Sequence, residues 1–250
     1  AARRLQKKRH PDDAFSRDVR SDPDTPLPHW FWCIGAIAML DFSTLDRAWS
    51  TVFDQFAQRV AATATGQGLE TAKLLQAHAN RRPHWQLHAH DVVLAGTLAA
   101  MDRDPLVEAL ERLSPFLAWN TRGVFTDSSA TTRAYVELLG PDGMLQTDEI
   151  RLGVYWHDRH TFYPRHRHEA VELYHVVSGT ALWQHVSEEW VPRPPDSFVL
   201  HQSNEDHATK TLDQPLLALW SWLGDISFDT YSMDQAPAEL GTEFRDFARN

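Results

Sequence analysis

Two histidines, a carboxylate and a phenol lie close together in this chain, at His166, His168, Glu172 and Tyr174. All four positions are even-numbered, and the side chains of an extended segment alternate between its two faces. If the segment is one extended strand, the four side chains project to the same side. Two imidazoles and a carboxylate on one face form most of a transition-metal site, and a phenol beside them is a candidate acid or base. The pattern therefore indicates chemistry rather than packing.

A further metal ligand is expected from the segment that begins at His201, which follows a short predicted strand over Ser197–Leu200. His207 is the preferred ligand, and His201 is an alternative that the spacing leaves open. Three imidazoles and one carboxylate leave coordination positions for water or substrate, as a catalytic metal requires. These ligands suit one divalent ion among Fe(II), Mn(II), Co(II), Ni(II) and Zn(II), and they do not choose among them.

Tyr174 and Tyr163 are the candidate catalytic phenols. Tyr174 shares the predicted face of Glu172, and it is either a core tyrosine or a general base. As a base, its pKa, ordinarily about 10, would be lowered by a neighbouring metal cation. The direction of Tyr163 is left open, because Pro164 interrupts the alternation between it and His166.

Other candidates for chemistry are weaker. His84, His88 and His90 form a second histidine cluster, but no carboxylate follows at ligand spacing. We therefore interpret these three as structural or exposed. The chain contains no nucleophile-elbow motif for Ser-His-Asp catalysis and no glycine-rich phosphate loop.

Composition excludes several classes of partner. The chain has 250 residues, 42% of them hydrophobic, enough for one sizeable core with a large extension. The net charge of -10 argues against nucleic acid. The single cysteine, Cys33, excludes an internal disulfide and is compatible with a cytoplasmic location. No run reaches the roughly 18 apolar residues of a membrane helix, and Trp30–Leu40 stops at Asp41.

The chain divides into three predicted regions: a flexible lead segment over 1–28, a helical region over 29–125 and a β-rich region over 126–250. Apolar residues spaced by three and four predict a helix that starts at a capping-box-like Ser43 and Asp46 and ends at Gly66. Asp104 and Pro105 predict the start of another helix. A weaker helix is expected over Asp91–Met101.

From about residue 130 the apolar period changes to two, which is typical of β-strands. Ile150, Leu152, Val154 and Trp156 alternate with their neighbours, and turn signals recur at short intervals after them. Several short strands separated by turns predict a sandwich or barrel. The expected fold class is mainly β, with a helical N-terminal extension.

The segment His166-x-His168-x3-Glu172-x6-Gly179 resembles the first motif of the cupin superfamily. It departs at the front, where His160 occupies the usual glycine position. The second motif is looser: Pro195-Asp196 and His207 match, and Thr211 stands where asparagine is common. The resemblance implies a double-stranded β-helix, or jelly-roll, barrel.

Within the cupins, the chain is similar to the bacterial dimethylsulfoniopropionate (DMSP) lyases over about residues 150–230. The similar segments are Tyr163-Pro-x-His166-x-His168-x-Ala170-x-Glu172-Leu-Tyr174-x-Val176-x-Ser178-Gly179 and Trp220-Ser-Trp222-Leu-Gly-Asp-Ile. The resemblance implies that His166, His168, Glu172 and His207 hold the metal. It also implies that Tyr174 is the base and that Tyr163 is a pocket residue or helper.

A metal-dependent lyase that cleaves DMSP to dimethyl sulfide and acrylate is therefore the leading hypothesis. The substrate is a small zwitterion, and its sulfonium needs an aromatic wall. The candidates for that wall are Trp156, Trp183, Trp190, Trp220, Trp222 and Phe162. Two alternatives stay open: another cupin enzyme, such as a dioxygenase or an isomerase on a small acid or sugar, and a non-enzymatic ligand-binding cupin. No membrane partner is expected, and a homodimer is the candidate assembly.

Overall fold

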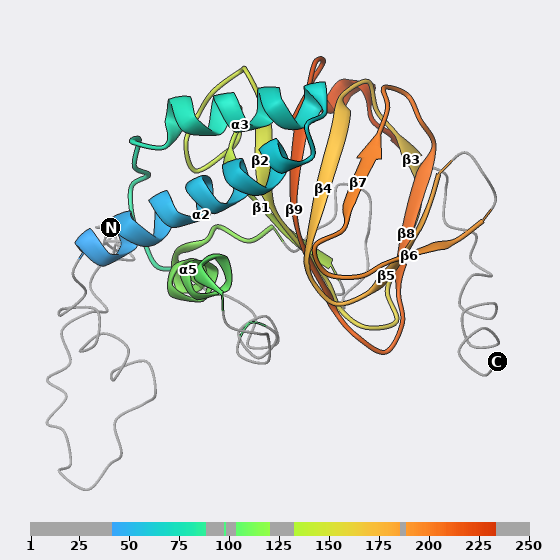
Figure 1. Cartoon of the computed structure of the whole chain (residues 1–250), viewed down its shortest axis with the longest axis horizontal. Coiled ribbons are helices and arrows are strands. Elements are labelled where there is room, and N and C mark those ends of the chain that lie inside the picture. Colours follow the sequence, from blue (N-terminus) through green and yellow to red (C-terminus); the bar gives the residue numbers. More distant parts are fainter. Residues whose placement is uncertain (1–41, 89–97, 99–103, 121–132, 186–188, 234–250) are drawn as a thin grey trace, which may run out of the picture. The chain divides into compact units, whose positions relative to one another are not determined.

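The computed structural model describes residues 42–88, 98, 104–120, 133–185 and 189–233 (Figure 1). The described residues belong to one compact unit. The lead segment expected over 1–28 lies outside the described residues, and so does the helix expected over Asp91–Met101 apart from Leu98. The division between a helical region over 29–125 and a barrel over 126–250 stays a prediction.

Three α-helices are described: α2 (Phe42–Ala62), α3 (Gly66–His78) and α5 (Pro105–Leu113), the last followed by a 3-10 turn at Ser114–Phe116. The predicted apolar stripe of α2 is buried, at Leu45, Ala48, Trp49, Val52, Phe53, Phe56, Ala57 and Val60. None of the described helices combines the length and the apolar character that crossing a membrane requires.

The expected ends of the first helix are wrong. Ser43 lies inside α2, and its hydroxyl accepts a hydrogen bond from Arg47 at 2.9 Å. Gly66 begins α3 rather than ending α2, because the Thr65 hydroxyl accepts from the Gly68 amide at 3.0 Å and caps a new helix there. The threonine immediately before Gly66 is the signal that outweighs the glycine.

The cap predicted at Asp104 is confirmed. Its Oδ1 accepts from the amides of Leu106 and Val107 at 2.7 and 3.0 Å. Its Oδ2 pairs with Arg59 of α2 at 3.0 Å, and the same guanidinium reaches Asp196, in the turn before strand β7, at 3.1 Å. Arg59 of α2 therefore links the N-terminus of α5 and the turn that contains Asp196.

The strands form two antiparallel sheets of five. The first has the order β1-β2-β9-β4-β7 and the second the order β10-β3-β8-β5-β6. Their bounds are β1 (Arg133–Leu139), β2 (Arg151–His157), β3 (Phe162–Arg167), β4 (Val171–Ser178), β5 (Ala181–Gln184), β6 (Val191–Arg193), β7 (Phe198–His201), β8 (His207–Thr211), β9 (Leu216–Leu223) and β10 (Ser232–Met233).

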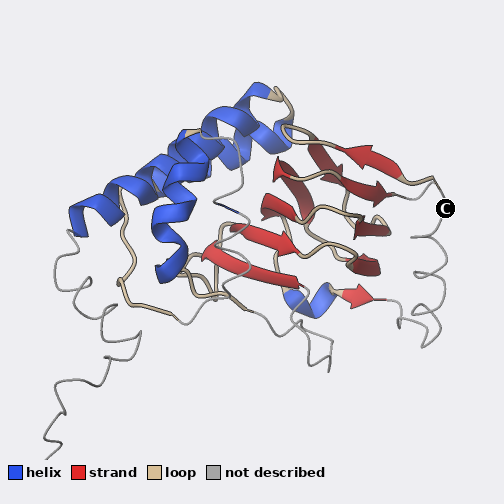
Figure 2. Cartoon of the chain, turned by 90° about the horizontal axis from the view of Figure 1, so that it is seen from below, coloured by secondary structure: helices blue, strands red, loops and turns tan. Residues whose placement is uncertain are grey.

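The two sheets enclose a shared interior, because one buried cluster draws on both: Tyr174 and Val176 come from β4, and Ala181 and Trp183 come from β5. The helices gather beside the first sheet (Figure 2). There the Gln67 amide of α3 donates to the carbonyl oxygen of Val171 at 3.1 Å. The expected fold class is confirmed: the β-half is a cupin jelly-roll barrel, and a helical layer lies against one sheet.

The departures from the usual cupin motif have local explanations. His160 adopts a left-handed backbone with φ of 55°, which is the conformation that a glycine at this position takes readily. The Thr211 hydroxyl accepts from the Thr161 amide at 2.9 Å and donates to the Asp158 carbonyl at 2.5 Å, so threonine bridges this turn. Gly179 is required, because its φ is 78° and a Cβ there would overlap the carbonyl oxygen of Pro215.

Candidate metal centre and its cavity

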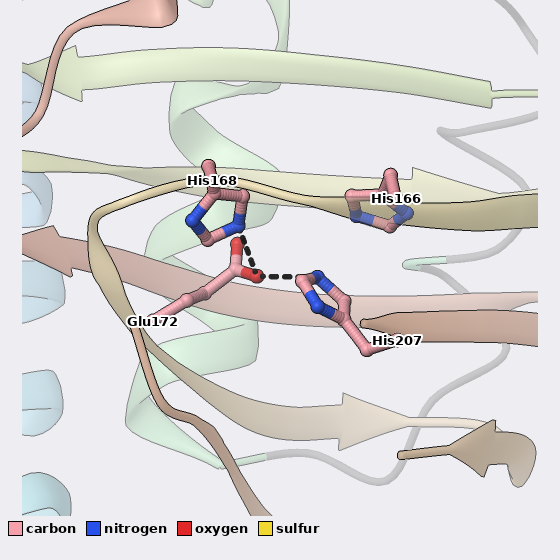
Figure 3. A group of neighbouring side chains, drawn as sticks. All are labelled: His166, His168, Glu172 and His207. Carbon is pink, nitrogen blue, oxygen red and sulfur yellow. Dashed lines mark hydrogen bonds and ion pairs between the residues drawn. The ribbon is translucent and has the colours of Figure 1, made fainter. Parts of the chain in front are cut away.

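Three imidazoles and one carboxylate meet inside the barrel, from His166, His168, Glu172 and His207 (Figure 3). Each offers one donor atom, and these atoms all lie within 4.8 Å of one another. All four side chains are buried. The cluster is therefore a group that could bind a metal ion, built from borderline nitrogen and oxygen donors.

The residues of this cluster do not lie on a single extended strand. β3 ends at Arg167 and β4 begins at Val171, and the two strands belong to different sheets. His166 and His168 therefore reach the interior from one side and Glu172 from the other. Shared parity along one strand is the wrong explanation, and the side chains converge because the two sheets face each other. His207 joins them because β8 pairs with β3 in a register that places it opposite His166.

The three imidazoles have the same tautomer. Nδ1 of His166 lies 2.8 Å from the carbonyl oxygen of Pro164, Nδ1 of His168 lies 2.9 Å from that of Ala170, and Nδ1 of His207 lies 2.8 Å from that of Glu205. A carbonyl only accepts, so each Nδ1 carries a proton and donates it. Each neutral ring then presents the Nε2 lone pair, as a metal ligand must.

Glu172 completes the donor set and is itself held in place. Its Oε1 accepts from the Trp222 indole at 2.7 Å, because β4 and β9 pair with these two residues opposite each other. Its Oε2 lies 3.3 Å from Nε2 of both His168 and His207. Burial alone raises the pKa of the carboxyl, but its interactions with the two imidazoles hold that pKa well below its ordinary value.

This arrangement fits a bound cation. When these rings are neutral with the proton on Nδ1, the lone pairs on Nε2 of His168 and His207 face Oε2 of the Glu172 carboxylate, and a cation between them would relieve that contact. Nε2 of His207 is buried and has no hydrogen-bond partner among the described residues. Burial lowers the pKa of His166 well below its ordinary value, so that ring is neutral at pH 7. The residues present thus suit a divalent transition metal.

Tyr174 lies on the same interior face, two residues beyond Glu172 on β4. Its ring is 5% exposed and packs against Trp183 at 4.7 Å between ring centroids. Burial and the Glu172 carboxylate raise the pKa of Tyr174 well above its ordinary value. The lowered pKa expected for a catalytic phenol is therefore not a property of the chain alone, and it depends on a cation at the cluster.

Tyr163, whose direction the sequence leaves open, points into the same cavity. Its ring stacks on His166 with 4.1 Å between centroids, and its hydroxyl lies 2.5 Å from that of Tyr231. Burial raises the pKa of Tyr163 to about 12. The guanidinium of Arg133 lies over the Tyr163 ring, with its Cζ 4.3 Å from the ring centroid.

A cavity of about 80 Å³ connects these groups. Of the aromatic residues predicted for its wall, Trp220 and Trp222 line it, and Trp156, Trp183, Trp190 and Phe162 do not. The other lining residues are Asn120, Arg133, Ala134, Tyr135, Tyr155, Tyr163, His166, Glu172, Tyr174, Phe228, Tyr231 and Met233.

Sequence reasoning missed Arg133, Tyr135 and Tyr231 as cavity residues. Tyr135 lies on β1, at the edge of its sheet, and its ring meets Trp220 edge to face at 6.4 Å. Tyr231 precedes β10, the short strand that pairs with β3. No motif surrounds these residues, and only the period-two pattern before β2 could have suggested an inward-facing side chain from β1.

The remaining histidines fall outside the first cluster. His84 and His88 are in an irregular segment between α3 and α5, and His90 lies outside the described residues. His201 ends β7 beside the cluster, with its ring stacked on His207 at 3.8 Å and 12°. Burial lowers the pKa of His201 well below its ordinary value. His201 is grouped instead with His185 and Glu205.

A jelly-roll barrel with three imidazoles and a carboxylate gathered in its interior defines a cupin whose cluster could hold a metal ion. The family model for dimethylsulfoniopropionate lyase matches residues 57–218, which is more than half of the chain. The chain therefore belongs to the DMSP lyase family.

Individual relatives agree with this assignment. The chain is 35% identical to the DMSP lyase DddQ of Ruegeria pomeroyi over 91 residues, covering 36% of this chain and 44% of that protein. It is 29% identical to the putative DMSP lyase DddL of Cereibacter sphaeroides over 139 residues, covering 54% and 56%. The alignments thus span about half the length of these curated relatives.

Solved structures share the fold. A chain from the crystal structures of the DMSP lyases RdDddP and RnDddQII is 26% identical, with a TM-score of 0.52, over 74% of this chain and all of that one. The crystal structure of DddQ from Ruegeria pomeroyi is 20% identical, with a TM-score of 0.50, over 72% of this chain and 96% of that one.

Proposed function

We propose that this protein is a metal-dependent lyase that cleaves DMSP to dimethyl sulfide and acrylate. One divalent ion, Fe(II), Mn(II), Co(II), Ni(II) or Zn(II), is held by His166, His168, Glu172 and His207. Tyr174 is the base. The observation that carries the proposal is that the Tyr174 phenol, the carboxylate of Glu172 and the imidazole of His166 line one small cavity. Family membership supplies the substrate class.

The elimination is balanced without an oxidant. Tyr174 acts as the phenolate, after its own proton has passed to solvent: its oxygen takes the proton from the α-carbon of DMSP, and the electron pair of that C–H bond forms the double bond to the β-carbon. The bond between the β-carbon and sulfur breaks, and its electrons leave with sulfur as neutral dimethyl sulfide. A bound divalent cation supplies positive charge that acidifies the α-proton and stabilises the charge that develops on the substrate carboxylate.

Charge and aromatic surface in the cavity orient the zwitterion. The guanidinium of Arg133 lines the cavity beside the Tyr163 ring, so the substrate carboxylate is expected on the side of the cavity where this positive charge lies. The sulfonium is expected against Tyr135 and Trp220, away from Arg133. The analogue 3-(methylthio)propanoate keeps the carboxylate but has an uncharged sulfur, and it should bind about 2- to 30-fold more weakly, because it loses a cation–π contribution of roughly 0.5–2 kcal/mol. Equal affinity in a competition assay would rule out this orientation.

The direct test supplies DMSP to protein reconstituted with each of the five metals in turn. Dimethyl sulfide is followed by gas chromatography and acrylate by liquid chromatography. We expect equal amounts of both products, above a blank of metal and DMSP without protein. The absence of product with every metal would overturn the proposal, and consumption of O₂ with product would favour an oxygenase instead.

The matched variant is Tyr174→Phe, which removes one hydroxyl and keeps the buried ring. We expect metal content equal to that of the wild type and a loss of turnover to the blank. If turnover survives, Tyr174 is not the base, although the lyase assignment stands. Tyr163→Phe separates the two phenols: as a helper, Tyr163 should contribute less to turnover than Tyr174.

The native metal, a cytoplasmic location and a homodimeric assembly remain predictions from the sequence and family. Metal analysis of protein purified without added metal, and light scattering, test the first and the last.

A further inference from the structure

We propose a second metal site, formed by His185, His201 and Glu205, that binds a divalent ion of the zinc type beside the first cluster. The site goes beyond the proposed lyase activity, which uses none of these side chains. One donor atom from each residue lies within 4.8 Å of the others. His185 follows β5, His201 ends β7, and Glu205 lies in the turn before β8.

Two of the three groups already contact each other. Nδ1 of His185 lies 3.2 Å from Oε1 of Glu205. The ring of His185 lies 4.6 Å from that of His201 between centroids. The side chains of His185 and Glu205 are 22% and 18% exposed, so the site opens to water on the side away from His201. An aqueous ion can therefore enter, and water can complete its coordination.

His201 is the independent observation that points to a ligand. It is 0% exposed, and neither of its ring nitrogens has a hydrogen-bond partner within the part of the chain that the structure describes. A buried imidazole with both nitrogens unsatisfied is rare, because buried polar groups normally find partners. A cation shared with His185 and Glu205 would satisfy one of these nitrogens.

The donor chemistry selects the class of ion. Two imidazoles and one carboxylate suit Zn(II), Co(II) or Ni(II), whereas Ca(II) and Mg(II) prefer oxygen ligands alone. The site has three protein donors and is partly open, against four buried donors in the first cluster. We therefore expect it to bind more weakly and to exchange its ion more readily.

Glu205 connects the two sites. Its Oε2 accepts from the Gln202 amide at 2.7 Å, which closes the turn between β7 and β8. Its backbone carbonyl accepts from Nδ1 of His207 at 2.8 Å, and so orients a residue of the first cluster. An ion on the Glu205 side chain would hold that carbonyl in place. The second site thus stabilises the position of His207.

The test counts metal rather than activity. Wild type, His185→Ala and Glu205→Gln are dialysed against Zn(II), and the bound metal per chain is measured by mass spectrometry. His84→Ala is the matched control, because His84 is exposed and outside both clusters. We expect His185→Ala and Glu205→Gln each to bind one equivalent less than the wild type, and His84→Ala to bind the same amount. An unchanged count in both site variants overturns the proposal.

The expected loss of one bound metal ion in His185→Ala does not depend on whether the first cluster binds metal. If that cluster holds no metal, the wild type binds one equivalent and His185→Ala binds none. If both sites exist, His166→Ala and His185→Ala each lose a different equivalent and the double variant loses two. Failure of the lyase proposal and failure of the second site are therefore distinguishable.

A spectroscopic readout checks that the lost equivalent comes from imidazole ligands. Co(II) added to the wild type should give visible absorption bands, and His185→Ala should lose part of them. Thermal unfolding without metal should show that His185→Ala folds like the wild type. A folded variant with an unchanged Co(II) spectrum would contradict the site.

Discussion

Two histidine clusters lie side by side in this barrel, and they differ in how their imidazoles are held. Each histidine of the first cluster donates Nδ1–H to a backbone carbonyl within 2.9 Å and leaves Nε2 for a ligand. In the second cluster, His201 has no partner on either nitrogen among the described residues. One ring from each cluster, His207 from the first and His201 from the second, stack on each other with 3.8 Å between ring centroids.

The contrast shows that proximity and orientation are separate properties of a metal site. Both clusters bring donor atoms within 4.8 Å of one another. Only the first also selects the tautomer of each ring and the rotation of its carboxylate, through Trp222. The first cluster is preorganised for the proposed catalytic ion, whereas the rings of the second would be oriented by the ion proposed there.

The largest expected effect comes from removing a donor of the first cluster. His166→Ala should abolish the release of dimethyl sulfide and lower metal affinity by more than about 100-fold, since it removes a ligand and not only a partner that orients one. Gas chromatography and metal analysis measure both changes. His84→Ala should behave as the wild type, and retention of activity by His166→Ala would remove the distinction between the clusters.

A smaller effect is expected from loosening the first cluster without removing a ligand. Trp222→Phe deletes the indole N–H that donates to Oε1 of Glu172 and keeps an aromatic ring. Metal affinity, measured by competition with a chelator, should fall by about 10- to 100-fold. The control is Trp190→Phe, because Trp190 packs on Phe162 and does not line the cavity. Equal affinities for the two variants would show that the indole does not orient Glu172.

The next effect concerns pH. Burial lowers the pKa of His157, His166 and His201, and that of His175 to about 4. In the unfolded chain these groups titrate near 6.5, so below that pH the unfolded state binds protons that the folded state does not. The metal-free protein should therefore lose stability as pH falls from about 6.5 towards 4. The loss should exceed about 1 kcal/mol, since one pKa unit corresponds to about 1.4 kcal/mol.

Urea unfolding at pH 7.5 and pH 5, with a chelator present, measures this change. Stability should also depend on pH in the alkaline range, because the pKa of Tyr163, about 12 in the folded protein, exceeds the ordinary value of about 10. Above pH 10 the unfolded chain releases a proton that the folded chain retains, and stability should fall again. A free energy of unfolding that is constant from pH 7.5 to 5 would contradict the assignment of neutral, buried imidazoles.

The smallest effect should have the opposite sign. His201→Leu replaces an unpartnered imidazole by an apolar side chain, so the metal-free protein should gain about 1 kcal/mol of stability. The equivalent change in the first cluster is His168→Leu. It also removes the hydrogen bond from Nδ1 of His168 to the carbonyl oxygen of Ala170, so it should not be stabilising. If His201→Leu destabilises the metal-free protein, the ring has a structural role and the comparison between the clusters fails.

Much of the fold could be predicted from local sequence. The cap at Asp104 and the apolar stripe of α2 depend on neighbours within one or two turns, so their patterns are legible in the sequence. The boundary at Gly66 was misjudged because the neighbouring Thr65 caps a new helix at that point. A glycine alone does not say whether a helix ends or begins.

The site was predictable where its residues share a motif and not where they meet across sheets. His166, His168 and Glu172 lie in one short segment, although a turn between sheets, and not strand parity, brings them together. Trp222 faces Glu172 only because of the register between β4 and β9. Arg133 enters the cavity from an edge strand with no motif of its own. Such pairings are properties of the closed barrel.

The carbonyls that hold the first cluster each come from a residue two positions away in sequence: Pro164 for His166, Ala170 for His168 and Glu205 for His207. Because each contact is local, every ring can settle into its ligating form as soon as its own strand or turn has formed. Folding of the polypeptide alone would therefore position the donors, and a metal ion that is added afterwards should need little rearrangement of the ligands. Protein that is purified without metal should then take up an ion without first unfolding.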